Sequence, residues 1–259
     1  MNSGETLAHQ SAGTGQGPPI VLLHGFGGSS RDFDRIAPLL TPLGRTIAFD
    51  LPGHGKSVHA AGSRHPKAAA EAILRALDGM GVDDFHLGGF SMGGAVACLI
   101  ASRSPGRVRS LTLLAPGGFG PEAATDVLLD FAAARSAGEV RSALSRMTAQ
   151  DAAISDQVIG ALVKQRADPN LGETLAELAK LLFGGGGQGV LDLAGLEAID
   201  CPVNVVWGAD DPILPVRQSQ GLPKRFGVRQ IVGSGHMLLE EAPGEVVAAF
   251  RRSIGEAGA

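Results

Sequence analysis

Short, almost purely apolar segments alternate along this chain with longer segments of helical periodicity. The run Ile20-Val21-Leu22-Leu23 contains no polar residue, which is typical of a strand buried on both faces of a parallel sheet. Alternation of such strands with helices predicts an α/β fold, with a mostly parallel sheet and flanking helices. The candidate strands are Pro19–His24, Arg45–Asp50, Asp84–Phe90, Val108–Ala115, Val203–Trp207 and Val228–Val232, and the candidate helices are Arg31–Leu43, Pro66–Met80, Met92–Ser104 and Ala242–Ile254.

The segment from residue 117 to about 196 interrupts this alternation. It contains helical stretches without a clear strand, and it is too long for an ordinary crossover connection. We therefore expect a helical lid at residues 117–196, inserted between two parts of an α/β core at residues 1–116 and 197–259. The alternative is one long helical connection packed on the sheet. The helical stretches are Glu122–Arg135, Glu139–Thr148, Asp151–Ala167 and Gly172–Phe183, followed by the glycine run Gly184–Gly187.

The composition of the 259 residues excludes several classes of protein. With 44% hydrophobic and 19% charged residues, the chain is not a disordered one. Sparse aromatic residues and a net charge of −4 argue against a nucleic-acid or anionic-lipid surface. We expect Cys98 and Cys201 to be reduced. The first basic residue is Arg31 and no apolar stretch could span a membrane, so a cytoplasmic protein is expected; its oligomeric state stays open.

The segment Gly89-Phe90-Ser91-Met92-Gly93 is the strongest functional signal. An apolar strand leads into Ser91 and a helix-forming run leaves it, so this G-x-S-x-G pattern lies on a sharp strand-to-helix turn. Such a turn exposes the serine hydroxyl at the carboxyl end of the strand. The flanking glycines let strand and helix approach each other without a side-chain collision. A serine at its ordinary pKa is a poor nucleophile, so an adjacent base is required.

Candidates for the base, and for the acid that orients it, follow two later strands. His236 lies in a glycine-containing loop after Val228–Val232, and Asp210 and Asp211 follow Val203–Trp207. Because the carboxyl ends of parallel strands share one edge of a sheet, Ser91, one aspartate and His236 are expected to meet there. Their order along the chain, serine, aspartate and then histidine, is that of α/β-hydrolases.

On these motifs the chain resembles the α/β-hydrolase fold family over nearly its whole length. His24-Gly25-Phe26-Gly27-Gly28 is similar to the family's oxyanion loop, and Asp50 to Ser57 is similar to its D-x-P-G-x-G-x-S turn. In relatives with W-G-x-x-D-x-x-x-P the acid is the aspartate three residues after the glycine, which implies Asp211. The resemblance further implies oxyanion donors at the backbone N–H groups of Phe26 and Met92, a substrate site with Gly25, Gly27, Phe90 and Met237, and structural roles for His24 and His54.

The activity that the resemblance implies is that of a serine hydrolase without cofactor or metal, acting on a small-molecule acyl substrate. It would cleave a small carboxylic ester or lactone through an acyl-enzyme. One alternative is a carbon–carbon bond hydrolase of a ring-cleavage pathway, against which two departures count: Gly28 and Ser29 follow Gly27 where those enzymes carry P-G, and Met237 stands where tryptophan is usual.

A second alternative is an acyl-transfer protein similar to the hydrolase-like portion of dihydrolipoamide acyltransferase subunits of acetoin dehydrogenases. The segment ahead of Pro19 is too short for a lipoyl domain, and it is also short for the family's first edge strand. A non-catalytic binding protein is disfavoured because Ser91, Asp211 and His236 are all present.

Apolar residues of the lid recur at helical spacings and are expected either to cement the lid or to line an acyl pocket. They include Val127, Leu128, Phe131, Leu144, Met147, Val158, Leu162, Leu178, Leu181 and Phe183. The lid arginines are candidate anchors for a substrate carboxylate, although solvated surface charges are the simpler interpretation; they are Arg135, Arg141, Arg146 and Arg166.

Overall fold

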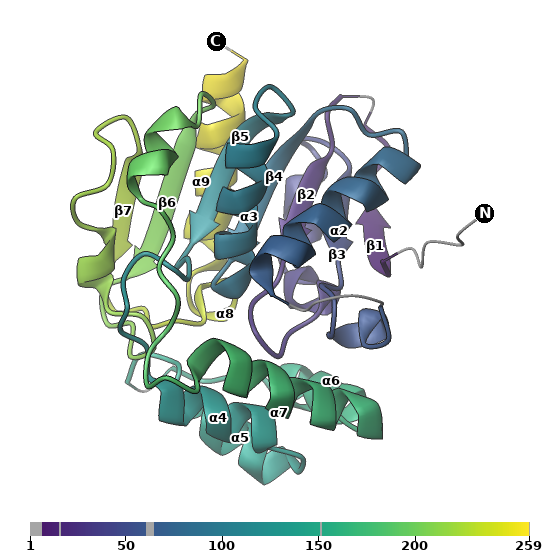
Figure 1. The fold of residues 1–259 in the computed structure, drawn as a ribbon, viewed down its shortest axis with the longest axis vertical. Coiled ribbons are helices and arrows are strands. Elements are labelled where there is room, and N and C mark those ends of the chain that lie inside the picture. Colours follow the sequence, from purple (N-terminus) through teal and green to yellow (C-terminus); the bar gives the residue numbers. More distant parts are fainter. Residues whose placement is uncertain (1–6, 16, 61–64, 151, 259) are drawn as a thin grey trace.

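The computed structural model describes residues 7–15, 17–60, 65–150 and 152–258. Its centre is a seven-stranded sheet in the order β1-β3-β2-β4-β5-β6-β7, in which β1 is antiparallel to β3 and the other neighbours are parallel. The strands are β1 (His9–Ala12), β2 (Ile20–Leu23), β3 (Thr46–Phe49), β4 (Phe85–Phe90), β5 (Val108–Leu114), β6 (Val203–Gly208) and β7 (Gly227–Ile231). The predicted α/β fold with a mostly parallel sheet is confirmed (Figure 1).

An edge strand precedes the first predicted strand, contrary to the expectation from the short amino-terminal segment. β1 pairs with β3, with His9 opposite Phe49 and Ala12 opposite Thr46. Its residues are exposed or half-buried, so the strand carries no apolar run by which a sequence pattern could reveal it.

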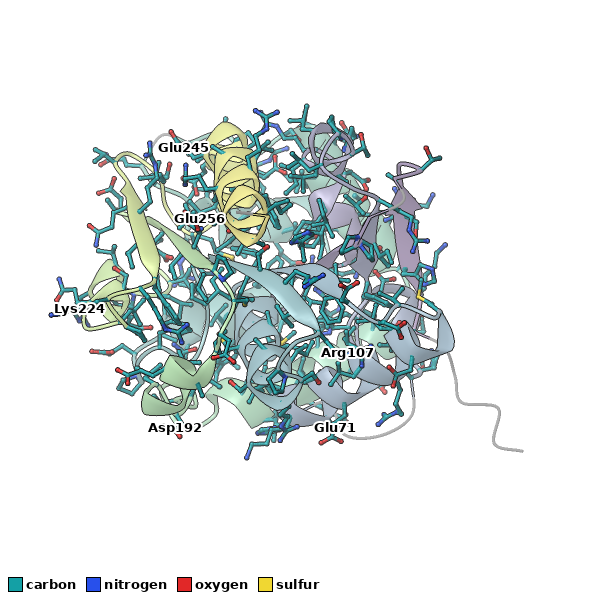
Figure 2. The ribbon with its side chains drawn as sticks, turned by 90° about the horizontal axis from the view of Figure 1, so that it is seen from above. Glu71, Arg107, Asp192, Lys224, Glu245 and Glu256 are labelled. Carbon is teal, nitrogen blue, oxygen red and sulfur yellow. The ribbon has the colours of Figure 1, made fainter. Side chains whose placement is uncertain are left out.

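Helices cover both faces of the sheet. The helices α2 (Pro66–Gly79) and α3 (Met92–Arg103) lie on one face and α9 (Pro243–Ala257) lies on the other, as the two views agree (Figure 1 and Figure 2). On the α9 side the ring of Phe250 is 1% exposed, and a Cβ placed on Gly88 would lie 2.3 Å from its Cζ atom. The glycine in the central strand therefore makes room for the aromatic ring that anchors α9.

The predicted helix Arg31–Leu43 is wrong in its extent. The chain forms a 3₁₀ turn at Ser30–Phe33 and then a short helix, α1 (Ala37–Leu40). Pro38 lies in the first turn of α1, and Pro42 follows its end. Since proline has no N–H to donate and its ring clashes with the preceding turn, one continuous helix cannot run through this segment.

Helices α4 (Thr125–Ala133), α5 (Ala137–Ser145), α6 (Asp156–Gln165) and α7 (Pro169–Phe183) follow one another between β5 and β6. The side chains of Ser136, Ser155 and Asp168 accept N–H groups at the starts of α5, α6 and α7, which ends each preceding turn and begins the next helix. Residues 125–150 and 152–183, which contain these four helices, are called the helical insertion; in Figure 1 they form a separate layer beneath the sheet. Asp151, at the predicted start of the third stretch, lies outside the described residues.

The helical insertion is the feature on which the predicted division into a core and a lid rests, and its function as a lid remains a prediction. Among the described helices, none has both the length and the apolar character needed to cross a bilayer. The short α8 (Leu238–Glu241) directly precedes α9.

The direction of the chain changes at the centre of the sheet. From β2 it proceeds to β3 on one side, and then returns to β4 on the other side of β2. The connections that leave β2 and β4 therefore diverge, which opens a crevice at the carboxyl ends of these two strands. Phe26 follows β2 and Ser91 follows β4, so both lie at this crevice.

The turn from β4 to α3 is strained at Ser91. This residue has φ 51° and ψ −118°, in a region that a residue with a Cβ rarely adopts. Two glycines make the turn possible: a Cβ on Gly89 would lie 2.4 Å from the carbonyl oxygen of Gly93, and a Cβ on Gly93 would lie 2.2 Å from that of Leu23. The first turn of α3 thus packs directly on backbone, and this contact fixes the position of Ser91.

The strain at Ser91 can be measured by comparing two variants that both remove the hydroxyl group. We expect Ser91→Gly to be more stable than Ser91→Ala by about 1 kcal/mol or more, because glycine adopts a positive φ without steric cost. Urea unfolding of both variants measures the difference. An alanine variant as stable as the glycine variant would show that the backbone at this position is unstrained.

Candidate active site

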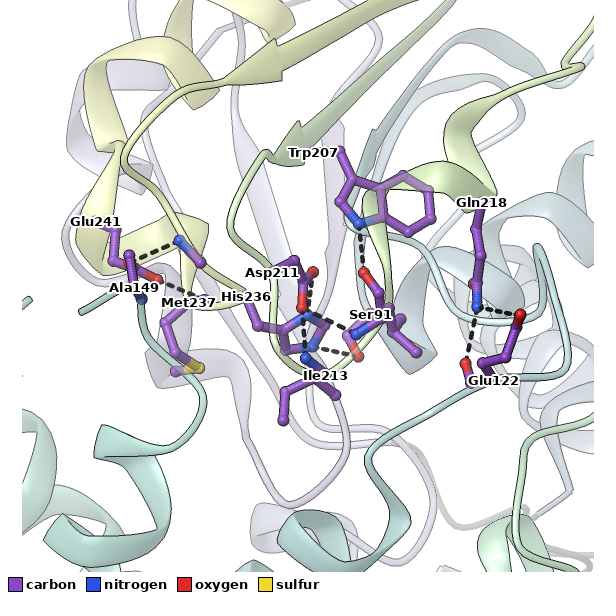
Figure 3. Close-up of polar contacts among 12 residues, drawn as sticks. Ser91, Glu122, Ala149, Trp207, Asp211, Ile213, Gln218, His236, Met237 and Glu241 are labelled. Atoms are coloured by element: carbon purple, nitrogen blue, oxygen red, sulfur yellow. Dashed lines mark hydrogen bonds and ion pairs between the residues drawn. The ribbon is translucent and has the colours of Figure 1, made fainter.

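Ser91, His236 and Asp211 form a continuous chain of hydrogen bonds. The Oγ atom of Ser91 lies 3.0 Å from Nε2 of His236, and Nδ1 of His236 lies 2.8 Å from Oδ2 of Asp211 (Figure 3). The histidine is 3% exposed and the aspartate 8% exposed. The three residues expected to meet at the carboxyl edge of the sheet are therefore in contact, in an arrangement that lets His236 accept the serine proton while Asp211 orients the ring.

The adjacent residues Asp210 and Asp211 have different hydrogen-bond partners. The second carboxylate oxygen of Asp211, Oδ1, accepts the backbone N–H groups of Ile213 and Leu214 at 2.8 Å and 2.9 Å. Asp210 instead accepts the N–H of Gly233 at 2.9 Å, which braces the loop ahead of His236. The structure thus places Asp211, and not Asp210, against the imidazole.

The tryptophan of the chain supports the loop that carries Asp211. Trp207 is fully buried at the end of β6, and its indole N–H donates to the carbonyl oxygen of Leu214 at 2.9 Å (Figure 3). Leu214 is one of the two residues whose N–H groups hold Asp211. The indole therefore supports, through Leu214, the loop that carries the aspartate.

Two backbone N–H groups beside Ser91 have no protein partner among the described residues. They belong to Phe26, after β2, and to Met92, the first residue of α3. The N–H groups in the first turn of a helix have no acceptor within the helix, and both residues line a cavity that also contains Ser91. These are the positions expected for donors to an oxyanion, and such donors must be available for a developing negative charge.

His24 and His54 pack beside the loop after β2 that carries Phe26. The side chain of His24 is fully buried; its Nδ1 lies 2.7 Å from the carbonyl oxygen of Gly25, and its Nε2 accepts the N–H of Leu51 at 2.9 Å. This pattern requires the neutral ring with the proton on Nδ1, and burial lowers the pKa of His24. His54 is also fully buried, with its ring 5.0 Å from that of His24. Both contacts suit the structural roles expected for these residues.

Two cavities meet at Ser91. The larger, of about 560 Å³, contains Ser91 together with His236 and Met237, whereas the smaller, of about 340 Å³, contains Ser91 together with Met92. Of the four residues expected to bind substrate, Gly25, Phe90 and Met237 line the larger cavity. Gly27 is not among the described lining residues of either cavity; a Cβ placed on it would lie 2.6 Å from the Phe131 ring, which shows how closely the helical insertion covers this glycine.

The helical insertion supplies apolar walls to both cavities. Its residues in the larger cavity include Leu128, Phe131, Leu144, Met147, Val158 and Leu162. Leu181 and Phe183, from α7, line the smaller cavity. Val127 and Leu178 are buried without lining either cavity, so helical spacing alone does not separate the residues that cement the insertion from those that face the site.

None of the four arginines singled out from the insertion lines either cavity. Arg141 pairs with Asp156, and Arg146 pairs with Asp126 and Asp130. Arg135 donates to backbone carbonyl oxygens. Arg166 is 5% exposed and stacks at 4.2 Å on the Phe131 ring, and burial lowers its pKa to about 10.

The charged lining residues of the larger cavity come from elsewhere and were not anticipated. They are Arg31, Asp32, Asp34, Arg35 and Glu240. Burial raises the pKa of Asp32 to about 7, and the nearby Asp50 and Glu240 act in the same direction. The carboxyl of Asp32 therefore becomes negatively charged only near physiological pH. No sequence motif marks these positions, because they become neighbours only through the fold.

Comparison with known proteins supports the assignment of the fold. A family model described as the alpha/beta hydrolase fold matches residues 18–243. The chain is 34% identical over 230 residues to the dihydrolipoyllysine-residue acetyltransferase component of the acetoin cleaving system of Pseudomonas putida, an alignment that covers 89% of this chain and 61% of that protein. This chain thus spans about six tenths of the length of that relative.

Two further similarities come from proteins of closer length. The chain is 31% identical over 250 residues to the pimeloyl-[acyl-carrier protein] methyl ester esterase of Chromobacterium violaceum, covering 91% of this chain and 86% of that one. The structure of a meta-cleavage product hydrolase from Pseudomonas fluorescens IP01 superimposes with a TM-score of 0.80 at 18% identity, over 95% of each chain. With the match to the family model, these similarities establish that the chain belongs to the α/β-hydrolase fold family.

Proposed function

We propose that this protein is a serine hydrolase that cleaves a small carboxylic ester or lactone. The observation that carries the proposal is the hydrogen-bonded chain of Ser91, His236 and Asp211 at the junction of two cavities. A small-molecule acyl substrate, a cytoplasmic location, and the absence of a cofactor and of nucleic-acid or membrane partners are parts of the same proposal.

In the first half of the reaction, His236 takes the proton of the Ser91 hydroxyl as the oxygen attacks the substrate carbonyl carbon. Asp211 keeps the imidazole proton on Nδ1, so that Nε2 is free to accept, and it stabilises the imidazolium that forms. The negative charge that develops on the carbonyl oxygen is held by the N–H groups of Phe26 and Met92. One such donor typically lowers the barrier by about 2.7–4 kcal/mol.

Collapse of the tetrahedral intermediate leaves the acyl group on Ser91. His236 gives its proton to the oxygen of the leaving group, and later removes a proton from the water that attacks the acyl-enzyme. Transfer to a thiol instead of water would differ only in the group that attacks at this stage. The acetyltransferase component of the acetoin cleaving system, to which this chain is similar, makes acyl transfer the alternative activity.

The two cavities suggest where the two halves of the substrate lie. The leaving group must be near His236, which protonates it, and His236 lines the larger cavity. The smaller cavity has Met92, one of the proposed oxyanion donors, but not His236. We therefore propose that the acyl chain enters the smaller cavity and that the leaving group occupies the larger one.

A carbon–carbon hydrolase activity remains the other alternative. The meta-cleavage product hydrolase resembles this chain in fold, and a serine–histidine–aspartate arrangement is compatible with that reaction as well. The esterase relative shares more sequence with the chain over a similar coverage. On that ground an ester is the substrate that we favour.

The roles of the three residues can be tested with p-nitrophenyl acetate. We expect Ser91→Ala to abolish turnover and Asp211→Asn to lower kcat by about 10⁴, because an asparagine amide would favour the wrong imidazole tautomer. Asp210→Asn is the matched control: its amide oxygen can still accept the Gly233 N–H, and kcat should stay within about tenfold of the wild type. Equal losses in the two aspartate variants, or turnover by Ser91→Ala near the wild-type rate, would refute the assignment.

The proposed position of the acyl chain in the smaller cavity can be tested separately. Ala95 lines the smaller cavity, and a leucine side chain there would occupy part of its space. We expect Ala95→Leu to lower kcat/KM for p-nitrophenyl hexanoate at least about tenfold more than for p-nitrophenyl acetate, since only the longer acyl chain needs that space. Leu162→Ala, which widens the larger cavity, should leave the ratio of the two substrates unchanged. If Leu162→Ala changes the ratio of the two substrates and Ala95→Leu does not, the acyl chain lies in the larger cavity and the leaving group in the smaller one.

A further inference from the structure

The carboxylate of Glu241, at the end of α8, accepts three backbone N–H groups. Its Oε2 atom accepts the N–H of Gly235 at 2.8 Å and that of Ala149 at 2.9 Å. Its Oε1 atom accepts the N–H of Met237 at 2.9 Å. Figure 3 shows the side chain between Ala149 and Met237, beside the histidine loop.

Two of these donors immediately precede and follow His236. The third donor, Ala149, belongs to the segment between α5 and α6 of the helical insertion. The N–H of His236 itself donates to the carbonyl oxygen of Met147 at 2.9 Å. The loop that carries the histidine is therefore joined to the insertion both directly and through one carboxylate.

The contact between the two segments is too close for any side chain on the loop side. A Cβ placed on Gly235 would lie 2.3 Å from the nitrogen of Ala149 and 2.5 Å from the carbonyl carbon of Thr148. Backbone lies on backbone here, and hydrogen bonds from N–H groups to a carboxylate are short and directional. The geometry of this contact consequently restricts where the backbone of His236 can lie.

The neighbouring glutamate has a different role. Glu240 lies 3.5 Å from the guanidinium of Arg35 and lines the larger cavity. The carboxylate of Glu241, by contrast, accepts hydrogen bonds from the histidine loop and from the helical insertion, because three backbone N–H groups converge on its two oxygens. This separation of roles argues that the second glutamate serves the position of the loop and not the charge of the cavity.

We propose that Glu241 is a positioning residue for His236, and that it makes alignment of the base depend on docking of the helical insertion. The inference rests on the proposed serine-hydrolase function. His236 Nε2 is 3.0 Å from the Ser91 hydroxyl, and a displacement of about 1 Å between reacting groups can cost about a hundredfold in rate. Loss of the carboxylate would release Gly235 and Met237 together, and with them the histidine between them.

Met147 connects the larger cavity with the backbone of His236. Met147 lines that cavity, and its carbonyl oxygen accepts the His236 N–H. A substrate that packs on Met147 therefore contacts the segment that holds the histidine backbone. Contact of a substrate with the insertion and the position of the His236 backbone are therefore linked through Met147.

The test is Glu241→Gln, measured by steady-state hydrolysis of p-nitrophenyl acetate. A glutamine has one acceptor oxygen and an NH₂ group, so at least one of the three backbone N–H groups would face a donor. We expect kcat to fall between about tenfold and a hundredfold with KM changed by less than about threefold. The control is Glu245→Gln in the first turn of α9 (Figure 2), which removes a carboxylate paired with Arg229 of β7 and should leave kcat unchanged.

A second readout separates positioning from a general loss of stability. Hydrogen exchange of the wild-type protein should show the amides of Gly235, Met237 and Ala149 protected as one group, and Glu241→Gln should accelerate all three while the amides of β4 keep their protection. The histidine Nδ1 proton resonance should broaden or shift in the variant.

Wild-type kcat in Glu241→Gln, or a fall in kcat that follows thermal unfolding and disappears at lower temperature, would overturn the proposal. If Glu241→Gln does not fold, the wild-type exchange data decide: independent exchange of Ala149 from Gly235 and Met237 would overturn it. A wild-type protein that hydrolyses no ester would contradict the proposed function, while the exchange and resonance measurements would still test the position of His236.

Discussion

The whole site depends on how closely α3 approaches β2. The backbone of Gly93 packs so tightly on the carbonyl oxygens of Leu23 and His24 that a Cβ would lie 2.2 Å and 2.5 Å from them. With the helix held there, the chain leaving β4 can reach it only through the positive φ of Ser91. This single constraint exposes the hydroxyl group, brings the first N–H groups of α3 beside it, and sets the point at which both cavities meet.

The base and the acid reach this point from separate strands, and neither is held by the sheet alone. Asp211 is fixed by two N–H groups and by the loop that Trp207 supports. His236 lies in a loop that touches the helical insertion through backbone hydrogen bonds and through Glu241. The insertion thus contributes the walls of the cavities and, on our account, part of the precision with which the histidine faces Ser91.

Much of this arrangement could be predicted because its parts follow strands in the sequence. Ser91 comes directly after an apolar strand, Asp211 and His236 lie in the loops that follow two later predicted strands, and parallel strands place such residues at one edge. The strand His9–Ala12 could not be predicted, since its exposed residues carry no apolar pattern. The prediction of one helix after Arg31 overlooked Pro38, whose missing N–H limits the segment to a 3₁₀ turn and a short helix. Asp32 and Glu241 were missed because their surroundings, including the distant Ala149, are set by the fold and by no local motif.

Activation of Ser91 by His236 is tested most directly by covalent labelling of the folded wild-type protein with a fluorophosphonate, followed by peptide mass spectrometry. We expect one modified residue, Ser91, and a loss of ester hydrolysis in proportion to its modification, because only a serine activated by a base in hydrogen-bond contact reacts readily with such a probe. Ester hydrolysis that continues while Ser91 stays unmodified, or modification of a different serine with loss of activity, would contradict this activation.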